Sequence, residues 1–299
     1  MFTKFIDTTD EWITTRTGIR ERRMSPDKPN FMMAAEAAKA ALASAGKTAK
    51  DIDCIIVSTC SPDFYYPNTA CLVQNLIGAQ PCACMDVNTA CTGFITAVDI
   101  ARNFLANDTY KTVLIVASER LTSQIDYTDR ASCILFGDGA GAVVLEAGEN
   151  YLDAVFDVKG GDDVIDIPQP VGMSPFYERG QEKKPYIHMA GQETFKFAVT
   201  AICRDCKEIL ERNGLTFDDI AYIVPHQANQ RIIDFASTKL KVPKEKFYLN
   251  IHKYGNTSSA SIPIALDELN RAGKLHRGDL LLLPAFGGGL ASACCLVRW

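Results

Sequence analysis

The sequence predicts an α/β fold made of two duplicated halves. Apolar segments typical of buried strands alternate along the chain with segments whose apolar residues have helical spacing. The order of these segments in residues 34–145 recurs in residues 195–297. Any two α/β units look alike over a short run of elements, but agreement over so long a stretch favours duplication. With 299 residues the chain is long enough for two units, which we place at residues 1–150 and 151–299.

The first half is expected to hold its helices and strands in a fixed order. Its alanine-rich helix ends near Gly46, because glycine tolerates the left-handed backbone of a helix end, and an acidic turn then leads to an apolar strand. A glycine-rich turn, F-G-D-G-A-G, joins the last two strands. The predicted elements are a helix at 34–45, a strand at 51–57, a strand at 83–87, a helix at 92–105, and paired strands at 112–117 and 141–145.

The second half repeats this order, with Gly214 in the place of Gly46. An additional strand, at residues 151–158, opens this half and has no counterpart in the first. We therefore expect the sheet of the first half to lack one strand. The other predicted elements are a helix at 195–213, a strand at 217–224, a strand at 246–250, a helix at 258–272, and paired strands at 279–283 and 291–297.

Composition and charge argue against several classes of function. A net charge of −5 disfavours general nucleic-acid binding, and no apolar run reaches the ~18 residues that a membrane span needs. The chain also lacks the pattern of an N-terminal signal peptide, so we expect a cytoplasmic protein whose eleven cysteines are reduced thiols. Cys203 and Cys206 have C-x-x-C spacing but lie inside a helical pattern, and we predict no metal site.

Three residues of chemical interest lie where predicted strands end. Cys91 stands between the strand at 83–87 and the following helix, and Asn256 occupies the corresponding corner of the second half. His226 follows the strand at 217–224, in the sequence P-H-Q-A-N. Because strand ends on one side of an α/β sheet build its sites, we expect the three side chains to converge. Taken alone, Cys91 could instead fill a small space in the core, and His226 could be a satisfied buried histidine.

The three residue types fit one kind of reaction. A cysteine at a helix N-terminus is expected to have a lowered pKa, which favours the nucleophilic thiolate. A neutral histidine and an asparagine amide each donate a hydrogen bond to a developing oxyanion without carrying a formal charge. This combination predicts covalent acyl transfer to Cys91, followed by stabilisation of an enolate by His226 and Asn256.

Several separated motifs resemble one enzyme family. N-T-A-C-T-G-F at residues 88–94, P-H-Q-A-N-Q-R-I-I from residue 225, Y-G-N-T-S-S-A-S from residue 254 and A-F-G-G-G-L from residue 285 resemble the signatures of β-ketoacyl-acyl carrier protein synthase III. D-T-T-D-E-W-I-T-T-R-T-G-I-R at residues 7–20 and F-G-D-G-A-G-A from residue 136 are similar to it too. The resemblance implies a thiolase-like fold, with two mixed-sheet halves layered α-β-α-β-α, and an acyltransferase that initiates type II fatty-acid synthesis.

The resemblance also implies a role for each residue of the predicted site. Cys91 would accept the acyl group of a primer acyl-CoA. His226 and Asn256 would stabilise the enolate that forms when malonyl-acyl carrier protein loses carbon dioxide, and condensation would then give 3-oxoacyl-acyl carrier protein. The backbone N–H groups of Cys91 and Gly288 would form an oxyanion hole. The reaction requires no metal and no redox cofactor.

Binding residues around this site follow from the same resemblance. Trp12 and Arg130 match a pair that stacks on the adenine of CoA, and Arg16 matches a residue near the CoA phosphates. Lys196 and Arg231 match a basic patch that meets the acidic carrier protein. Their alternative interpretations are a core anchor for the tryptophan and ordinary surface charges for the others. Four more lysines could extend the patch: Lys239, Lys241, Lys244 and Lys246.

An acyl pocket is implied as well. Tyr66 matches an aromatic residue that reaches across a homodimer interface into the partner's pocket. Phe136, Met189 and Phe286 would line the pocket, although core packing is nearly as good an interpretation for each.

Three further readings of the function stay open, and departures from the family pattern lead to the first. The family has a longer N-terminus, which includes the strand missing from the first half, and L-A-S-A-C-C at residues 290–295 replaces a threonine-tryptophan-glycine run. One alternative is therefore a truncated, impaired homologue. Another is a related thiolase-fold condensing enzyme that acts on other acyl-CoA or carrier-bound substrates. A papain-like hydrolase also orders cysteine, histidine and asparagine in this way, but its C-G-S-C-W context is absent.

Overall fold

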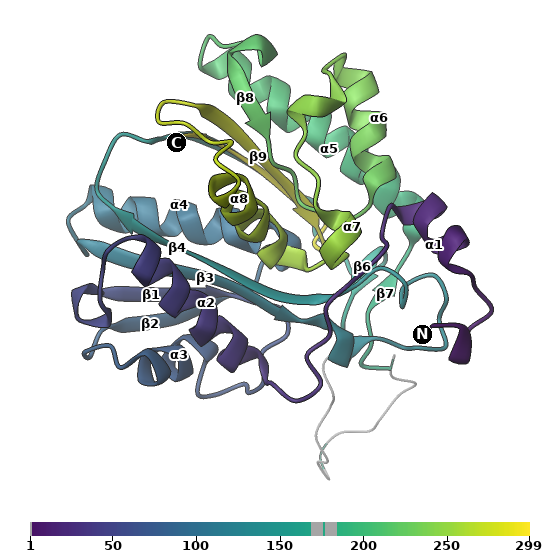
Figure 1. Cartoon of the computed structure of the whole chain (residues 1–299), viewed down its shortest axis with the longest axis horizontal. Helices are drawn as coiled ribbons and strands as arrows, with labels where there is room; N and C mark the ends of the chain where they lie inside the picture. Colours follow the sequence, from purple (N-terminus) through teal and green to yellow (C-terminus); the bar gives the residue numbers. More distant parts are fainter. Residues whose placement is uncertain (1, 169–175, 177–183) are drawn as a thin grey trace.

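The computed structural model describes residues 2–168, 176 and 184–299, and it holds two four-stranded sheets (Figure 1). The strand order is β2-β1-β3-β4 in the first sheet and β5-β10-β9-β8 in the second. The strands of the first sheet are β1 (Cys54–Ser58), β2 (Ala83–Val87), β3 (Thr112–Arg120) and β4 (Asp138–Glu146). Those of the second are β5 (Tyr151–Val158), β8 (Ile220–Ile223), β9 (Leu280–Gly287) and β10 (Ala291–Arg298). A small separate sheet pairs β6 (Ile165–Asp166) with β7 (His188–Met189).

Helices form three layers around these sheets. α2 and α3 cover the outer face of the first sheet, α4 and α8 lie between the sheets, and α5 and α6 cover the second sheet (Figure 1). This α-β-α-β-α order confirms the predicted thiolase-like fold. The helices are α1 (Asp10–Thr17), α2 (Asn30–Ser44), α3 (Thr69–Ile77), α4 (Gly93–Ala106), α5 (Gly191–Arg212), α6 (Gln230–Leu240), α7 (Ile251–Tyr254) and α8 (Ser261–Arg271).

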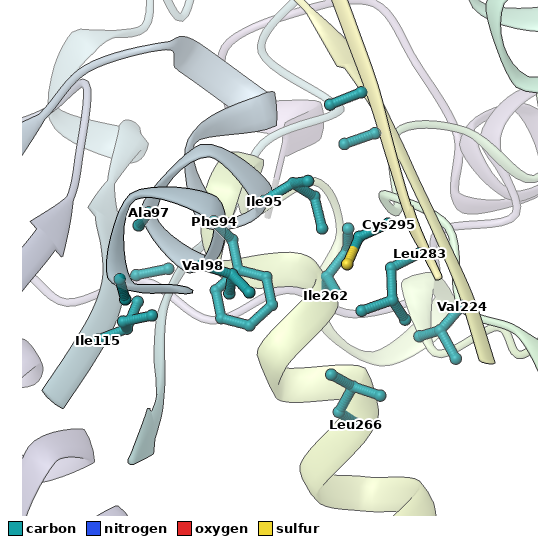
Figure 2. Packing of buried hydrophobic residues seen from close by; sticks show 14 of the residues in the cluster. Phe94, Ile95, Ala97, Val98, Ile115, Val224, Ile262, Leu266, Leu283 and Cys295 are labelled. Atoms are coloured by element: carbon teal, nitrogen blue, oxygen red, sulfur yellow. The ribbon is translucent and has the colours of Figure 1, made fainter. Parts of the chain in front are cut away.

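The two central helices are held by one apolar core. Phe94 and Ile95 of α4 and Ile262 of α8 are buried among strand residues of both sheets, such as Ile115 and Leu283 (Figure 2). Burial of each side chain of this size contributes about 1.5–3 kcal/mol. The core therefore fixes where α4 and α8 begin, and both helices begin next to the corners that the sequence singled out.

Matching turns confirm the predicted repeat of helix, glycine, acidic turn and strand. Before β1, Thr48 and Asp51 form a capping box, in which each side chain bonds the backbone of the other residue. Before β8, Thr216 and Asp219 form the same capping box. Two independent α/β units have no reason to share this detail, so the turns support duplication.

The strand predicted at 246–250 is wrong, because the second half reduces it to a single bridge between Phe247 and Ile223. The buried Gln227 side chain takes over the hydrogen bonds of this segment. Its Oε1 accepts from the N–H of Asn250 at 3.1 Å, and its Nε2 donates to the carbonyl of Tyr248 at 3.1 Å. A side chain thus satisfies backbone groups that a sheet partner would otherwise bind.

The edges of the two sheets differ. β10 is paired on both sides, with β5 and with β9. Its counterpart β4 pairs with β3, and no strand among residues 2–168 and 184–299 pairs with the other edge of β4. The first half therefore lacks a counterpart of β5, as predicted, and the outer edge of β4 keeps unpaired backbone groups. The division into two domains at residue 150 stays a prediction, although each sheet takes its strands from one side of it.

None of the described helices is long and apolar enough to cross a membrane. The eleven cysteines are all free thiols in the structure. Cys203 and Cys206 lie inside α5, as their helical pattern predicted. The cytoplasmic location stays a prediction.

Candidate active site

A cavity of about 260 Å³ opens where the two halves meet. Nine of the residues predicted from the sequence line it: Trp12, Arg16, Cys91, Phe136, Met189, His226, Asn256, Phe286 and Gly288. Cys91, His226 and Asn256 come from three separate segments of the chain, so the predicted convergence of these side chains is correct. The lining is mostly apolar, which suits an acyl group.

Cys91 lies in a tight turn between β2 and α4. Residues Ala90–Thr92 form a 3₁₀ turn, and Ala90 has a left-handed backbone with φ of 47°. Gly287 of β9 packs directly on the cysteine, since a Cβ added to this glycine would lie 3.1 Å from Cys91 Sγ. A side chain at position 287 would therefore displace the thiol, which explains why the strand ends in glycine here.

Asn256 is held by its backbone and by one side of its amide. Its N–H donates to the carbonyl of Leu135, and its carbonyl accepts from the N–H of Gly137, both at 2.9 Å. Its Oδ1 accepts from the N–H of Ser258 at 2.8 Å. Within the described residues Nδ2 has no hydrogen-bond partner, so the amide presents donor hydrogens at the cavity.

His226 is buried with its ring anchored from behind. Its Nδ1 lies 2.7 Å from the hydroxyl of Ser261, which also accepts from the N–H of Gln227. The hydroxyl hydrogen is thus available to Nδ1, and this assignment places the ring proton on Nε2. Burial lowers the pKa of His226 to about 3, against a smaller opposing effect of the Ser258 backbone. The imidazole is therefore neutral at pH 7, as expected from the sequence.

The thiol of Cys91 differs from the expectation of a lowered pKa. Burial raises the pKa of Cys91 to about 12, and the charge of Glu119 raises it further. The Ser258 hydroxyl, which donates to Cys91 Sγ at 3.3 Å, and the local backbone both lower it but do not outweigh burial. The expectation was wrong because it counted the helix end, a local feature, without the desolvation that the packed halves impose.

Glu119 lies beneath the thiol at the end of β3 and is fully buried. Its Oε2 accepts from the hydroxyl of Ser61 at 2.6 Å and from the N–H of Cys60 at 3.1 Å, and its Oε1 accepts from the hydroxyl of Ser259 at 2.8 Å. Burial raises the pKa of Glu119, although these donors oppose the rise. The donors satisfy the carboxylate, so the site can hold this buried negative charge.

The three residues predicted to bind CoA meet at the mouth of the cavity. The guanidinium carbon of Arg16 lies 4.6 Å from the ring centroid of Trp12, and that of Arg130 lies 4.7 Å from it. These are cation–π distances. Arg130 also donates to the carbonyl of Asp7 at 3.1 Å. The arginines therefore stack on the indole itself, and an adenine could enter between Trp12 and Arg130 only if Arg130 moved aside.

The predicted carrier-protein residues lie on the helices beside this mouth. Lys196 on α5 and Arg231 on α6 are both exposed. Arg231 lies 5.9 Å from the ring of Phe195, and together with Trp12 and Arg16 it borders an open hollow of about 620 Å³. Glu11 also lines this hollow, so the two arginines give the rim a net positive charge.

Two of the four additional lysines do not extend the patch. Lys244 forms an ion pair with Asp234 at 2.7 Å, and Lys246 donates to backbone carbonyls, including that of Ile220 at 2.8 Å. Lys239 and Lys241 are exposed.

Tyr66 does not line the cavity of its own chain, and its side chain is 88% exposed. Phe136, Met189 and Phe286 line the cavity, and Phe286 contacts His226 with ring centroids 5.2 Å apart. The position of Tyr66 agrees with a residue that acts outside its own chain. Its role at a dimer interface stays a prediction.

Known proteins resemble this chain over nearly its whole length. Family models described as 3-oxoacyl-[acyl-carrier-protein (ACP)] synthase III and as the C terminal of that enzyme match residues 85–163 and 210–299. A β-ketoacyl-[acyl-carrier-protein] synthase III of Clostridium acetobutylicum is 44% identical, over 99% of this chain and 92% of the relative. The chain belongs to the 3-oxoacyl-[acyl-carrier-protein] synthase III family.

Solved structures agree with this assignment. The 3-oxoacyl-[acyl-carrier-protein] synthase III of Aquifex aeolicus superposes with a TM-score of 0.93 at 42% identity, and covers 100% of this chain and 94% of that one. The priming β-ketosynthase of the R1128 polyketide pathway superposes with a TM-score of 0.92 at 36% identity, and covers 99% and 90%. The chain is therefore a condensing enzyme of the acyltransferase class, and the papain-like hydrolase is excluded.

Sequence reasoning missed four residues around the three predicted ones. Ser258 contacts Cys91 and Ser261 contacts His226. Glu119 raises the pKa of Cys91 through its charge, and Cys60 lines the cavity and bonds to Glu119. A signal was present for Cys60 and Glu119, because Cys60 follows β1 and Glu119 lies near the end of β3, and the carboxyl ends of neighbouring parallel strands lie at one edge of a sheet. The serines stand in the Y-G-N-T-S-S-A-S motif, but nothing in the motif shows which hydroxyl faces the thiol.

Proposed function

We propose that this enzyme joins a primer acyl-CoA to malonyl-acyl carrier protein by decarboxylative Claisen condensation, through an acyl group held on Cys91. The observation that carries the proposal is the shared cavity in which the Cys91 thiol, a neutral His226 and the free amide end of Asn256 meet. A nucleophile and two uncharged donors are what covalent acyl transfer and enolate stabilisation need.

In the first half-reaction the Cys91 sulfur attacks the thioester carbonyl of the primer. The backbone N–H groups of Cys91 and Gly288 hold the resulting oxyanion. The tetrahedral adduct then expels the CoA thiolate, which leaves with the proton from Cys91, and the acyl group stays on the enzyme. Ser258 supports this step because its hydroxyl donates to Sγ and stabilises developing thiolate charge.

In the second half-reaction the malonyl thioester carbonyl accepts hydrogen bonds from His226 Nε2 and Asn256 Nδ2. Loss of carbon dioxide leaves an enolate on that oxygen, and the two donors stabilise it more strongly than the neutral carbonyl. The enolate carbon attacks the acyl-Cys91 carbonyl, and collapse of the adduct breaks the C–S bond and releases 3-oxoacyl-acyl carrier protein. The Cys91 sulfur leaves as a thiolate and takes a proton from water. Neither donor needs to ionise, which agrees with the burial of His226.

The residues around the three catalytic side chains bind the other parts of the two substrates. Trp12, Arg16 and Arg130 bind CoA at the mouth, where Arg130 moves off the indole to admit the adenine. The positive rim with Lys196 and Arg231 meets the acidic carrier protein. In a homodimer, Tyr66 reaches the acyl pocket of the partner, and Phe136, Met189 and Phe286 complete that pocket.

Mass spectrometry of the intact protein and of its peptides tests the proposal. After mixing with acetyl-CoA, and separately with isobutyryl-CoA, we expect an acyl adduct on Cys91 that malonyl-acyl carrier protein then discharges. Cys91→Ala should carry no adduct, whereas Cys71→Ala, which removes an exposed thiol, should still carry it. An adduct that persists in Cys91→Ala would refute Cys91 as the nucleophile.

A second candidate is a related condensing enzyme with other acyl-CoA or carrier-bound substrates. The observation that favours it is the similarity to a priming β-ketosynthase of a polyketide pathway. Both candidates use the same acyl-Cys91 step, so a panel of primers and carrier proteins separates them. Discharge by the carrier protein of fatty-acid synthesis at a lower rate than by another carrier would favour the second candidate.

A further inference from the structure

A second thiol faces the nucleophile in the same cavity. Cys60 lies in the loop after β1, lines the cavity with Cys91, and is half-buried, as Cys91 is. The proposed condensation has no use for it. A cysteine that shares a cavity with a reactive thiol has a chemical option of its own, because two thiols can be oxidised to a disulfide.

One hydroxyl contacts both sulfurs. Ser258 Oγ is 3.3 Å from Cys91 Sγ and 3.9 Å from Cys60 Sγ. Both sulfurs thus contact the same hydroxyl, and both side chains line the same cavity. Rotation of the Ser258 side chain would move this shared contact away from both sulfurs.

Glu119 is placed to act as a base for the Cys60 thiol. Its Oε2 lies 3.4 Å from Cys60 Sγ, which donates to it, and 3.1 Å from the Cys60 backbone nitrogen. Burial and the nearby carboxylate raise the pKa of Cys60, so the thiol keeps its proton at rest. The same carboxylate is placed to take that proton when the sulfur attacks, because it already accepts the S–H hydrogen bond.

We propose that Cys60 is a resolving thiol, which forms a reversible disulfide with Cys91 when a hydroperoxide oxidises the nucleophile. The inference rests on the reactivity that the proposed function assigns to Cys91. It makes this pair a redox modification site inside the acyl-transfer cavity.

The two steps balance with hydrogen peroxide as the oxidant. First, the Cys91 sulfur attacks a peroxide oxygen, the O–O bond breaks, and the thiol proton leaves with the departing oxygen as water, which gives a sulfenic acid. Second, the Cys60 sulfur attacks the Cys91 sulfur, the S–O bond breaks and an S–S bond forms. The Cys60 proton passes through Glu119 to the departing hydroxide, which leaves as a second water. Two thiols lose one electron each, and the peroxide gains two.

The pair would protect the enzyme from permanent damage. A sulfenic acid without a nearby thiol is oxidised further to sulfinic acid, which thiol reductants do not reverse. A disulfide stops that progression, and dithiothreitol restores both thiols. An acyl group on Cys91 blocks the first step, so bound primer should prevent the disulfide.

The test is peroxide titration of the whole protein, followed by peptide mapping without reduction and by acyl labelling. We expect a cross-linked pair of peptides containing Cys60 and Cys91, complete loss of labelling by acetyl-CoA, and complete recovery after dithiothreitol. Acylation before peroxide should prevent the cross-link. In Cys60→Ser, which keeps a donor to Glu119, we expect loss of labelling that dithiothreitol does not reverse, with sulfinic acid on Cys91. Cys71→Ser should behave as the unchanged protein does.

Two results would overturn the inference. One is sulfinic acid on Cys91 of the unchanged protein with no link to Cys60. The other is equal recovery in Cys60→Ser and in the unchanged protein. The proposed function can fail separately: absence of an acyl adduct before any oxidation would refute it, while a Cys60–Cys91 link in the same sample would still support the thiol pair.

Discussion

The two turns that precede α4 and α8, at residues 88–92 and 256–260, have the same backbone conformation but carry different functional side chains. In the first, Asn88 Oδ1 accepts from the N–H of Ala90 at 3.2 Å, and in the second, Asn256 Oδ1 accepts from the N–H of Ser258 at 2.8 Å. Ala90 and Ser258 have left-handed backbones, with φ of 47° and 48°, and each begins a 3₁₀ turn that continues into a central helix. Such angles are uncommon outside glycine, so their recurrence is a trace of the duplication.

Superposing the corners residue by residue pairs Cys91 with Ser259, and Asn256 with Asn88. Cys91 faces the cavity, whereas Ser259 is buried against Glu119. Asn256 faces the cavity, whereas Asn88 is exposed. The corners thus correspond, as expected from the sequence, but each half uses a different position of the shared turn for chemistry. The same type of turn thus supplies the nucleophile Cys91 in the first half and the oxyanion donor Asn256 in the second.

Moving the thiol to the other corner should have the largest effect. In the double variant Cys91→Ser with Ser259→Cys, we expect no acyl adduct at either position, because position 259 faces Glu119 instead of the cavity. Ser259→Cys alone should be acylated on Cys91 only. Peptide mass spectrometry after mixing with acetyl-CoA measures this, and an adduct on residue 259 would show that the two corners are interchangeable.

The second largest effect should come from the two asparagines, because only a change at Asn256 should slow decarboxylation. Asn256→Asp should slow malonyl decarboxylation by ~10²–10³, because it replaces an oxyanion donor with a negative charge. Asn88→Asp keeps an acceptor for the Ala90 N–H and should leave the rate unchanged. Release of carbon dioxide from malonyl-acyl carrier protein measures the effect. Equal slowing of Cys91 acylation in Asn256→Asp would contradict the enolate role.

The environment of the thiol predicts a pH dependence with a definite sign. With a pKa of about 12, only a small thiolate fraction exists at pH 7, so alkylation of Cys91 by iodoacetamide should rise about tenfold per pH unit up to pH 10. Ser258→Ala removes a hydrogen bond that lowers the pKa and should slow alkylation by about 10- to 100-fold. Glu119→Gln removes a charge that raises the pKa and should speed alkylation. A plateau below pH 10 in the unchanged protein would contradict the raised pKa.

Equivalent positions at the start of the central helices should differ in stability. A Cβ at Gly93 would lie 2.1 Å from Ser58 Oγ, so Gly93→Ala should lower the free energy of unfolding by about 1–3 kcal/mol. The corresponding Ser261→Ala removes the hydroxyl that bonds His226 Nδ1 and accepts from the N–H of Gln227, creates no steric overlap, and should cost about 0.5–1.5 kcal/mol. Urea denaturation measures both. A smaller cost for Gly93→Ala than for Ser261→Ala would contradict the close contact in the first corner.

Local patterns predicted the α/β fold, its duplication and the three central residues, whereas the layered order of sheets and helices came from the family resemblance. Cys91 and His226 follow the parallel strands β2 and β8, and such strands bring their carboxyl ends to one side of a sheet. Asn256 follows no strand, and its place was predicted from the repeat, which makes its turn the counterpart of the one that carries Cys91. The neutral state of His226 also followed from its proposed role. Cys60 and Glu119 obeyed the same rule, but no motif drew attention to them.

Other features depend on contacts that no local pattern records. The pKa of Cys91 is raised mainly because residues from several distant segments of the chain bury the thiol away from water. In the segment expected to be a strand at 246–250, the Gln227 side chain bonds backbone groups of residues 21 and 23 positions further along the chain, Tyr248 and Asn250. The spacing of Trp12 and Arg130 cannot reveal that they stack on each other.

That stacking gives the enzyme an optical reporter at its mouth. The chain has two tryptophans, and their environments differ. Trp299 packs against the central core and does not line the cavity, whereas the indole of Trp12 lies beside two guanidinium charges. Indole fluorescence responds to nearby charge, so a molecule that displaces Arg130 changes the emission of Trp12 and leaves that of Trp299 constant. Occupancy of the mouth can therefore be followed in real time, without a label and without turnover.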